Sequence, residues 1–292
     1  MNRRWALNLL LVAVLAALVA VAWLQPGQEK PAAKTPLTTL TADNIQTIRI
    51  ARAGGGGVAL ARAGTHWRLT APRAGRANAR RVETLLGLLA TDSLGQPSAD
   101  KRAEYGLDAP RVTVWFDATA IRIGREHAFD PKVYADVGGA IHLIAMHAAD
   151  AALTPPEDFH DPHLLDEDME LDEIRTRDFR VTRAATGAWS LTPPIENLPT
   201  DAVNRLVDEW RYAQALSVRA ADGRRPIDQV SIRVRRGADK NASVTTLKLG
   251  IVERTPELII HRPDEDLDYH FPREAADRLL NPRPVGAGTP GG

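Results

Sequence analysis

The sequence predicts an α+β fold with an N-terminal transmembrane helix followed by two tandem, similar modules, each a mostly antiparallel sheet with one packed helix. Three observations predict this fold: an apolar segment near the N-terminus, a short sequence segment that occurs twice, and an order of predicted strands and helices that repeats around that segment. The two copies are GTHWRLTAP, from Gly64, and GAWSLTPP, from Gly187. A chain of 292 residues is long enough for two domains of ordinary size.

The first element is the apolar segment at residues 5–24, in which Asn8 is the only strongly polar residue. Its length matches the roughly 20 residues that span the hydrocarbon core of a bilayer. Arg3 and Arg4 precede it, so the positive-inside rule keeps the N-terminus in the cytoplasm and sends the rest of the chain across. We therefore expect residues 1–24 to form a cytoplasmic stub and a signal anchor in the bacterial inner membrane, with the bulk of the chain in the periplasm.

A cleaved signal peptide is the alternative, because Ala20 and Ala22 form an A-x-A pattern. The apolar run exceeds the usual signal-peptide core of about 7–15 residues, which favours an uncleaved anchor. Residues 25–40 contain four prolines and glycines among charged residues and are expected to form a flexible linker.

The first α+β module is expected at residues 41–153. After an apolar stretch at 45–50, alternation places Trp67 and Leu69 on one face of a strand. A helix then begins near Asn78, a good N-cap residue. Its apolar residues, spaced i, i+3, i+4 and i+7, are Val82, Leu85, Leu86 and Leu89, and the strands that follow are expected at 112–116, 121–124, 133–137 and 141–144.

The second α+β module, at residues 171–280, repeats this order. Trp189 and Leu191 follow a stretch at 174–181, and a helix begins near Thr200. Its apolar residues are Val203, Leu206, Val207 and Trp210, and further strands are expected at 230–234, 247–250, 258–260 and 269–271. Both modules end with Ala-Ala-Asp, at 148–150 and 275–277, and a leucine lies three residues after each aspartate. The matched order indicates a duplication, and it favours core packing of both tryptophans under their helices over carbohydrate stacking.

The remaining segments are an acidic connecting segment at 154–170 and a disordered tail at 281–292. The connecting segment belongs to a longer acidic run, residues 157–173, that also carries His160 and His163. These two histidines could reach one metal ion if the segment turned helically. A solvated linker is the favoured interpretation, with its carboxylates facing the basic run of the first module or the arginines that follow, which are Arg175, Arg177 and Arg180.

That basic run consists of Arg73, Arg76, Arg80 and Arg81 in the loop entering the first helix. Solvated surface is the favoured interpretation, and a docking site for an acidic partner or anionic lipid headgroups is the alternative. His142 and His270 are expected in matched hairpin strands, and exposed strand positions are favoured there over paired ligand sites.

Several motifs resemble a known family: W-x-L-x-x-P at 67–72, YGLDAP at 105–110, I-x-I-G ending at Gly124, Tyr134, and HDPHLLD at 160–166. Together with the N-terminal apolar segment, they resemble a bacterial envelope family called domain of unknown function 4340. The second module lacks YGLDAP and has Gly-Arg-Arg-Pro at 223–226 in its place. The resemblance implies a genomic neighbourhood, since such proteins are often encoded near gliding-motility-type ABC transporter components, and it supplies no catalytic residues.

The composition and the motif content exclude several classes of function. The formal net charge is zero and the chain has no cysteine, which argues against a nucleic-acid footprint and excludes disulfides and thiolate nucleophiles. The sequence contains no G-x-S-x-G, H-E-x-x-H, Walker or dinucleotide-binding motif. We therefore predict no catalytic, cofactor-binding or metal-binding residues, no cofactor, and no nucleic-acid partner.

Three functions fit these observations. The first is an interaction or scaffold protein of the envelope, tethered to the inner membrane by residues 5–24, with an envelope protein partner such as components of an ABC-transporter-type complex. The second is a periplasmic binding module for a glycan or small solute, using the cleft between the modules. The third is a metal-dependent hydrolase centred on the acidic segment with His160 and His163. We favour them in that order and predict no catalysis.

Overall fold

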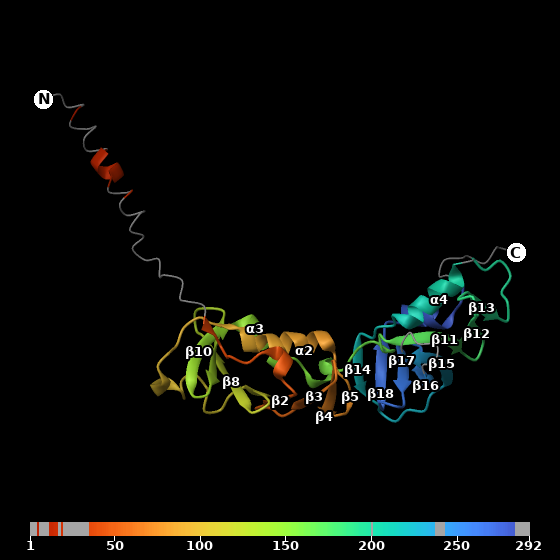
Figure 1. The fold of residues 1–292 in the computed structure, drawn as a ribbon, viewed down its shortest axis with the longest axis horizontal. Coiled ribbons are helices and arrows are strands. Elements are labelled where there is room, and N and C mark those ends of the chain that lie inside the picture. Colours follow the sequence, from red (N-terminus) through yellow and green to blue (C-terminus); the bar gives the residue numbers. More distant parts are fainter. Residues whose placement is uncertain are drawn as a thin grey trace.

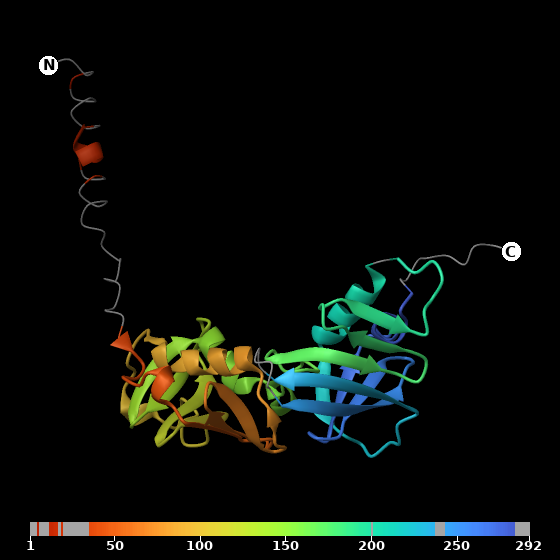
Figure 2. The same ribbon diagram turned by 45° about the vertical axis from the view of Figure 1, so that its right-hand side comes forward.

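A computed structural model describes Trp5, residues 12–16, residue 19, and residues 35–199, 201–236 and 243–283. The described chain is built around two eight-stranded sheets. They lie one after the other along the long axis of the molecule, each with helices packed on one face (Figure 1; Figure 2). The α+β class and the two tandem modules predicted from the sequence are therefore confirmed.

The first sheet has the order β10-β9-β8-β7-β2-β3-β4-β5 with antiparallel neighbours throughout. The elements of the first module are β1 (Thr35–Pro36), η1 (Ala42–Asn44), β2 (Thr47–Arg52), β3 (Val58–Ala63), β4 (His66–Ala71), β5 (Gly75–Arg76), α2 (Ala79–Leu86), η2 (Gly87–Ala90), β6 (Asp92–Ser93), η3 (Ala99–Lys101), β7 (Val112–Phe116), β8 (Thr119–Glu126), β9 (Lys132–Val137), β10 (Ala140–Ala145) and α3 (Met146–Leu153).

The second sheet has the order β13-β12-β11-β15-β16-β17-β18-β14, again antiparallel. After the connecting turn η4 (Pro156–Phe159), its module contains β11 (Met169–Arg175), β12 (Arg180–Arg183), β13 (Trp189–Thr192), α4 (Ala202–Arg211), β14 (Ser217–Ala220), β15 (Asp228–Arg236), β16 (Val244–Glu253), β17 (Leu258–Arg262), β18 (Leu267–Phe271) and α5 (Glu274–Leu280).

The two sheets share one topology. The series β4-β3-β2-β7-β8-β9-β10 corresponds strand for strand to β13-β12-β11-β15-β16-β17-β18. Trp67 lies in β4 and Trp189 in β13, so the repeated segments GTHWRLTAP and GAWSLTPP form equivalent strands. Both tryptophans pack against the hydrophobic core of their module, but each stays partly exposed because its strand lies near the end of the sheet.

The helices follow the predicted apolar spacing. The side chain of Asn78 accepts a hydrogen bond from the backbone N–H of Arg81 and caps α2, whose Leu85 is fully buried. In α4, Leu206 and Trp210 are buried in the same way, whereas the predicted start at Thr200 lies outside the described residues.

Each module has a second helix that the sequence prediction lacked. These helices, α3 and α5, lie at the two Ala-Ala-Asp phrases and follow the last strand of each hairpin. They are only about two turns long, too short for a periodic apolar signal. Alanines at their inner faces, such as Ala149 and Ala275, are buried and let the helices approach the sheets closely.

A glycine in the middle of each sheet lets another chain segment cross it. A Cβ atom on Gly124 would lie 2.2 Å from the backbone oxygen of Tyr105, at the start of YGLDAP. A Cβ atom on Gly250 would lie 2.5 Å from Cγ of Pro226. The Gly-Arg-Arg-Pro segment therefore takes the place of YGLDAP in the second module, as the sequence comparison indicated.

Part of the N-terminal and C-terminal predictions falls outside the described residues: most of the segment 5–24, residues 25–34 of the linker, and residues 284–292 of the tail. Within the described part of the chain, no helix combines the length and apolarity that a membrane crossing needs. The structured first module begins before the expected boundary at residue 41, because β1 pairs with β6 and Leu37 is buried.

The crossing over Gly124 gives a stability test. Gly124→Ala forces a side chain against the Tyr105 carbonyl, so we expect the free energy of unfolding to fall by about 1–3 kcal/mol, the usual cost of overpacking. Gly87→Ala is the control, because Gly87 has right-handed helical dihedrals and open space around it. Urea denaturation of both variants should show the control unchanged or slightly more stable; equal losses would contradict the account.

Candidate functional site at the junction between the modules

The connecting segment is anchored in both modules. Phe159 is fully buried in the core of the first module, and Leu164 and Leu165 are buried in the core of the second. The backbone N–H of Asn78 donates to the Phe159 oxygen at 2.8 Å, and that of Leu164 donates to the Ala213 oxygen at 2.9 Å. The prediction of a solvated acidic linker is therefore wrong: apolar residues between the acidic ones insert into the two cores in turn.

Arg76, on the edge strand β5, is the centre of the junction. Its Nε lies 2.8 Å from Oε1 of Glu265, and its Nη1 lies 3.0 Å from Oδ2 of Asp161 and 2.9 Å from Oδ1 of Asp166. Its Nη2 donates to the hydroxyl oxygen of Tyr269 at 2.9 Å. We call these five residues the junction cluster. Its members come from the first module, the connecting segment, and the turn and strand that end the second module's hairpin.

The side chains of the junction cluster are largely buried, so each charge strongly affects the pKa values of its neighbours. The Arg76 side chain is 11% exposed and that of Glu265 is 7% exposed. Burial alone would lower the pKa of Arg76, but Tyr269, Glu265 and the two aspartates raise it well above its ordinary value. Burial also raises the pKa of Tyr269, so its phenol stays protonated and donates to Oε2 of Glu265 at 2.5 Å. The guanidinium thus stays charged and holds three carboxylates.

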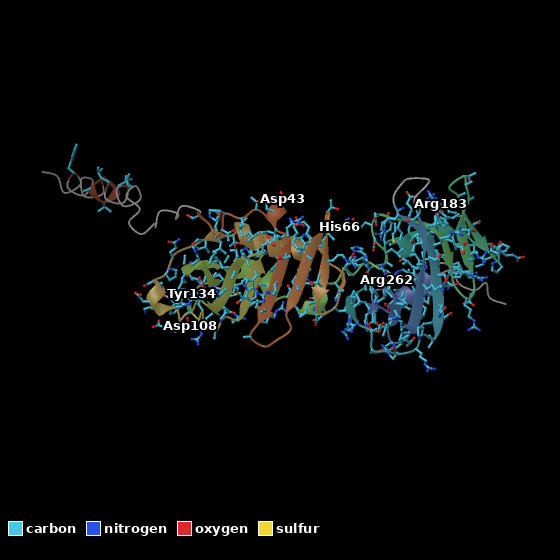
Figure 3. The ribbon with its side chains drawn as sticks, turned by 60° about the horizontal axis from the view of Figure 1, so that its bottom comes forward. Asp43, His66, Asp108, Tyr134, Arg183 and Arg262 are labelled. Atoms are coloured by element: carbon cyan, nitrogen blue, oxygen red, sulfur yellow. The ribbon has the colours of Figure 1, made fainter. Side chains whose placement is uncertain are left out.

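Arg262, at the end of β17, supports the same turn from within the second module. It is 3% exposed, and its Nη1 donates to the Leu164 backbone oxygen at 2.7 Å. Its Nη2 pairs with Oδ2 of Asp264 at 3.1 Å. Figure 3 labels Arg262 on the side of the second module that faces the first. The arginine thereby ties the connecting segment to the hairpin turn that carries Glu265.

The structure divides the predicted basic run. Arg73 forms an ion pair with Asp266 of the second module, and Arg76 is the buried centre of the junction cluster, so solvated surface is wrong for Arg76. Arg81 lies 3.8 Å from Asp158, whereas Arg80 is exposed. The acidic partner of this run is the chain's own connecting segment and second module. The prediction that the acidic residues face basic ones is confirmed here.

The two histidines of the connecting segment have different surroundings. His160 is buried against Gly75, and its Nδ1 has no hydrogen-bond partner among the residues that the structure describes. Nδ1 of His163 lies 2.8 Å from Oδ1 of Asp161, on the outer side of the junction cluster. The described residues contain no group of three or more side chains placed to hold a metal ion.

His142 and His270 are buried, so the expectation of exposed strand positions is wrong. They are also not equivalent. Counted from the hairpin turn, His142 lies in the third residue pair of β9 and β10, opposite Ala135. The third pair of β17 and β18 contains Tyr269, and His270 lies in the fourth. Tyr269 is therefore the counterpart of His142, and the burial of both strands comes from chain segments that cover this edge of each sheet.

His142 holds one such segment in place. Its Nδ1 lies 3.0 Å from the hydroxyl oxygen of Ser93, which itself donates to the Gly95 backbone oxygen. His270 makes a related contact, with Nδ1 2.9 Å from Oε1 of Glu257. Sequence reasoning missed these partners, and it also missed Glu265, Tyr269 and Arg262, because no recognisable motif links any of them to the residue that it contacts.

Removal of the central cation should be costly. Arg76→Ala removes the cation 2.8 Å from the buried Glu265 carboxylate, leaving Arg262 at 3.7 Å, and removes a hydrogen-bond donor to Tyr269. We therefore expect the free energy of unfolding to fall by about 3 kcal/mol. The exposed Arg80 gives a matched control, and Arg80→Ala is expected to change stability by about 0.5 kcal/mol or less. Chemical denaturation followed by tryptophan fluorescence checks this; a loss below 1 kcal/mol for Arg76→Ala would refute a stabilising junction.

His160 should make stability depend on pH. Burial lowers the pKa of His160; nearby Glu265 opposes this, and Arg73 and Arg76 add to it. The folded state therefore binds the proton less tightly than the unfolded state, whose pKa is about 6.5. The free energy of unfolding is expected to decrease as pH falls below that value.

In denaturation measurements from pH 7 to 5.5, His160→Gln should reduce this slope. Some slope should remain in the variant, because burial also lowers the pKa of His142. Equal slopes in wild type and His160→Gln would contradict the assignment to His160.

Comparison with known proteins gave one match, to a family model described as Domain of unknown function (DUF4340), over residues 67–229. No curated protein and no solved structure matches the chain. The matched region runs from β4 to β15 and includes α2, the connecting segment with two residues of the junction cluster, and Trp189. Because it covers more than half of the sequence, the chain belongs to the DUF4340 family.

Proposed function

We propose that this protein is a membrane-anchored periplasmic interaction or scaffold protein of the bacterial envelope, which acts by contact rather than by catalysis. The observation that carries the proposal is the junction cluster. Ion pairs with the buried guanidinium of Arg76 fix the second module relative to the first. A rigid pair of modules suits a protein that presents a surface at a defined position, since no freely jointed linker separates the two cores.

The apolar segment at residues 5–24 supports a membrane tether ahead of the first module. In Figure 1, β10 and β8 lie at one end of the long axis and β12 and β13 lie at the other. With a tether on the N-terminal side, the second module extends away from the membrane and carries the contact surface. The resemblance to proteins encoded near ABC transporter components suggests a transporter-type complex as the partner.

Three histidines that could have taken part in catalysis are engaged by neighbouring side chains, which also supports a contact role. His163 is engaged by Asp161, His142 by Ser93, and His270 by Glu257. The two modules share their apolar positions, while these ionisable residues differ between equivalent places. A duplicated active site would be expected to repeat its acids and bases.

A binding module for a glycan or small solute is the second candidate function. The junction between the modules is filled by the junction cluster, which leaves little support for the expected inter-module cleft. A cavity of about 150 Å³ beside Trp189, within the second module, is better placed to receive a ligand.

Photo-crosslinking in living cells tests the contact proposal. A photoreactive phenylalanine analogue replaces Leu216 or Ile227, two exposed apolar residues of the second module, or Phe129 of the first module as a comparison. We expect adducts to a defined inner-membrane protein from the second module. Arg76→Ala should reduce their yield at equal protein abundance, and Arg80→Ala should not.

Carbonate extraction of the same cells is expected to leave the full-length chain in the membrane fraction, as an uncleaved anchor requires. Release of a shorter soluble form would overturn the anchor. Absence of protein adducts from every position of the second module would overturn the contact role and favour a soluble ligand.

A further inference from the structure

A cavity of about 150 Å³ lies between α4 and the strands β11–β13 of the second module. Its lining includes the indole of Trp189 and four charged residues, Glu170, Arg183, Asp208 and Arg211. The volume equals that of about five water molecules in the liquid. A planar group of a few heavy atoms therefore fits the space.

Two other tryptophans on the sheets are covered by arginines of this chain. The guanidinium of Arg62 lies 4.7 Å from the ring centroid of Trp67, and that of Arg49 lies 3.7 Å from Trp115. Both pairs are cross-strand neighbours in the first sheet. Within the described part of the chain, no cation lies over Trp189 in this way.

The strand register gives Trp189 an arginine equivalent to the one beside Trp67. Arg183 pairs with Trp189 in the ladder of β12 and β13, as Arg62 pairs with Trp67 in β3 and β4. Backbone oxygens of Ile45 and Ala42 hold Arg62 in place at 2.8 and 2.9 Å.

The counterpart of Arg62 is drawn elsewhere: Nη1 of Arg183 pairs with Oε2 of Glu170 at 3.1 Å. Divergence of the two copies has therefore left the Trp189 indole facing a cavity in place of a stacked guanidinium.

The charges beside the indole suit a cation. Asp208 is exposed on α4 and its carboxylate has no ion pair with the described residues. The guanidinium of Arg211 is occupied over the ring of Tyr212, at 5.5 Å from its centroid. An incoming cation would meet the Trp189 face and the Asp208 carboxylate together, and a planar guanidinium stacks on an indole better than a compact ammonium.

We propose that this cavity, here called the Trp189 cavity, binds a guanidinium group, and that its natural occupant is an arginine side chain of a partner protein. The bound group would take over the place that Arg62 has on Trp67. This assignment rests on the proposed function, because it gives a chemistry to the contact made by the second module. The test of the guanidinium site needs no membrane partner, so this proposal and the proposed function can fail separately.

The test uses the full-length chain in detergent, labelled with 5-fluorotryptophan. The six tryptophans give six ¹⁹F resonances, and Trp189→Phe identifies that of Trp189. Acetyl-arginine amide is expected to shift this resonance in a saturable manner and to leave those of Trp67 and Trp115 nearly unchanged. Acetyl-citrulline amide, a neutral molecule of the same shape, should give no saturable shift.

The carboxylate is tested separately. Asp208→Asn should weaken the binding of acetyl-arginine amide about fivefold, the effect of losing one exposed ion pair. Asp201→Asn, at the start of the same helix and outside the cavity, should leave it unchanged.

Equal shifts with the citrulline compound, or no shift with the arginine compound, would overturn the proposal. A larger shift of Trp189 with a chitin or cellulose oligosaccharide would overturn it in favour of a glycan site. Failure of the crosslinking experiment with a positive ¹⁹F titration would reject the membrane partner and keep the guanidinium site.

Discussion

The guanidinium of Arg76 makes the contact on which the arrangement of the two modules depends. It extends from the edge strand β5 and meets carboxylates of Asp161, Asp166 and Glu265. Charges with so little exposure are tolerated only when they are paired, and displacement of the second module would separate Arg76 from the carboxylates of Asp166 and Glu265. The connecting segment is held by the same contacts, which is why acidic residues expected to be solvated are part of a packed interface.

The junction also shows how a duplicated fold acquires different uses. Tyr269 and His142 occupy the same position in equivalent hairpins. In the first module the residue at this position binds Ser93 and holds a segment against its own sheet. In the second it reaches Arg76 across the junction. The Trp67 and Trp189 sites have diverged in a comparable way, from a self-contained stack to an open cavity.

Local patterns predicted most of the fold. Alternation and helical spacing located the main strands, both longer helices and the duplication, because these signals depend on neighbouring residues. The crossing at Gly124 was not predicted, although a glycine inside a strand is typical of close backbone approach. The short helices α3 and α5 were missed because two turns carry too little periodicity.

The site was much less predictable. Arg76 and Glu265 stand 189 residues apart, and nothing in the neighbourhood of either residue indicates the other. When the two modules are compared by sequence, His142 matches His270 because the residues around them are similar. The strand registers show instead that the two histidines differ by one position in their hairpins. Long-range ion pairs and strand register depend on the assembled structure, and a single sequence contains little information about either.

A spin-label distance measurement tests the fixed junction most directly. The chain has no cysteine, so labels can be placed with Glu83→Cys on α2 and Lys248→Cys on β16, two exposed positions on regular elements. The account predicts one narrow distance distribution, broadened by Arg76→Ala and unchanged by Arg80→Ala. A broad distribution in the chain with intact Arg76 would contradict it.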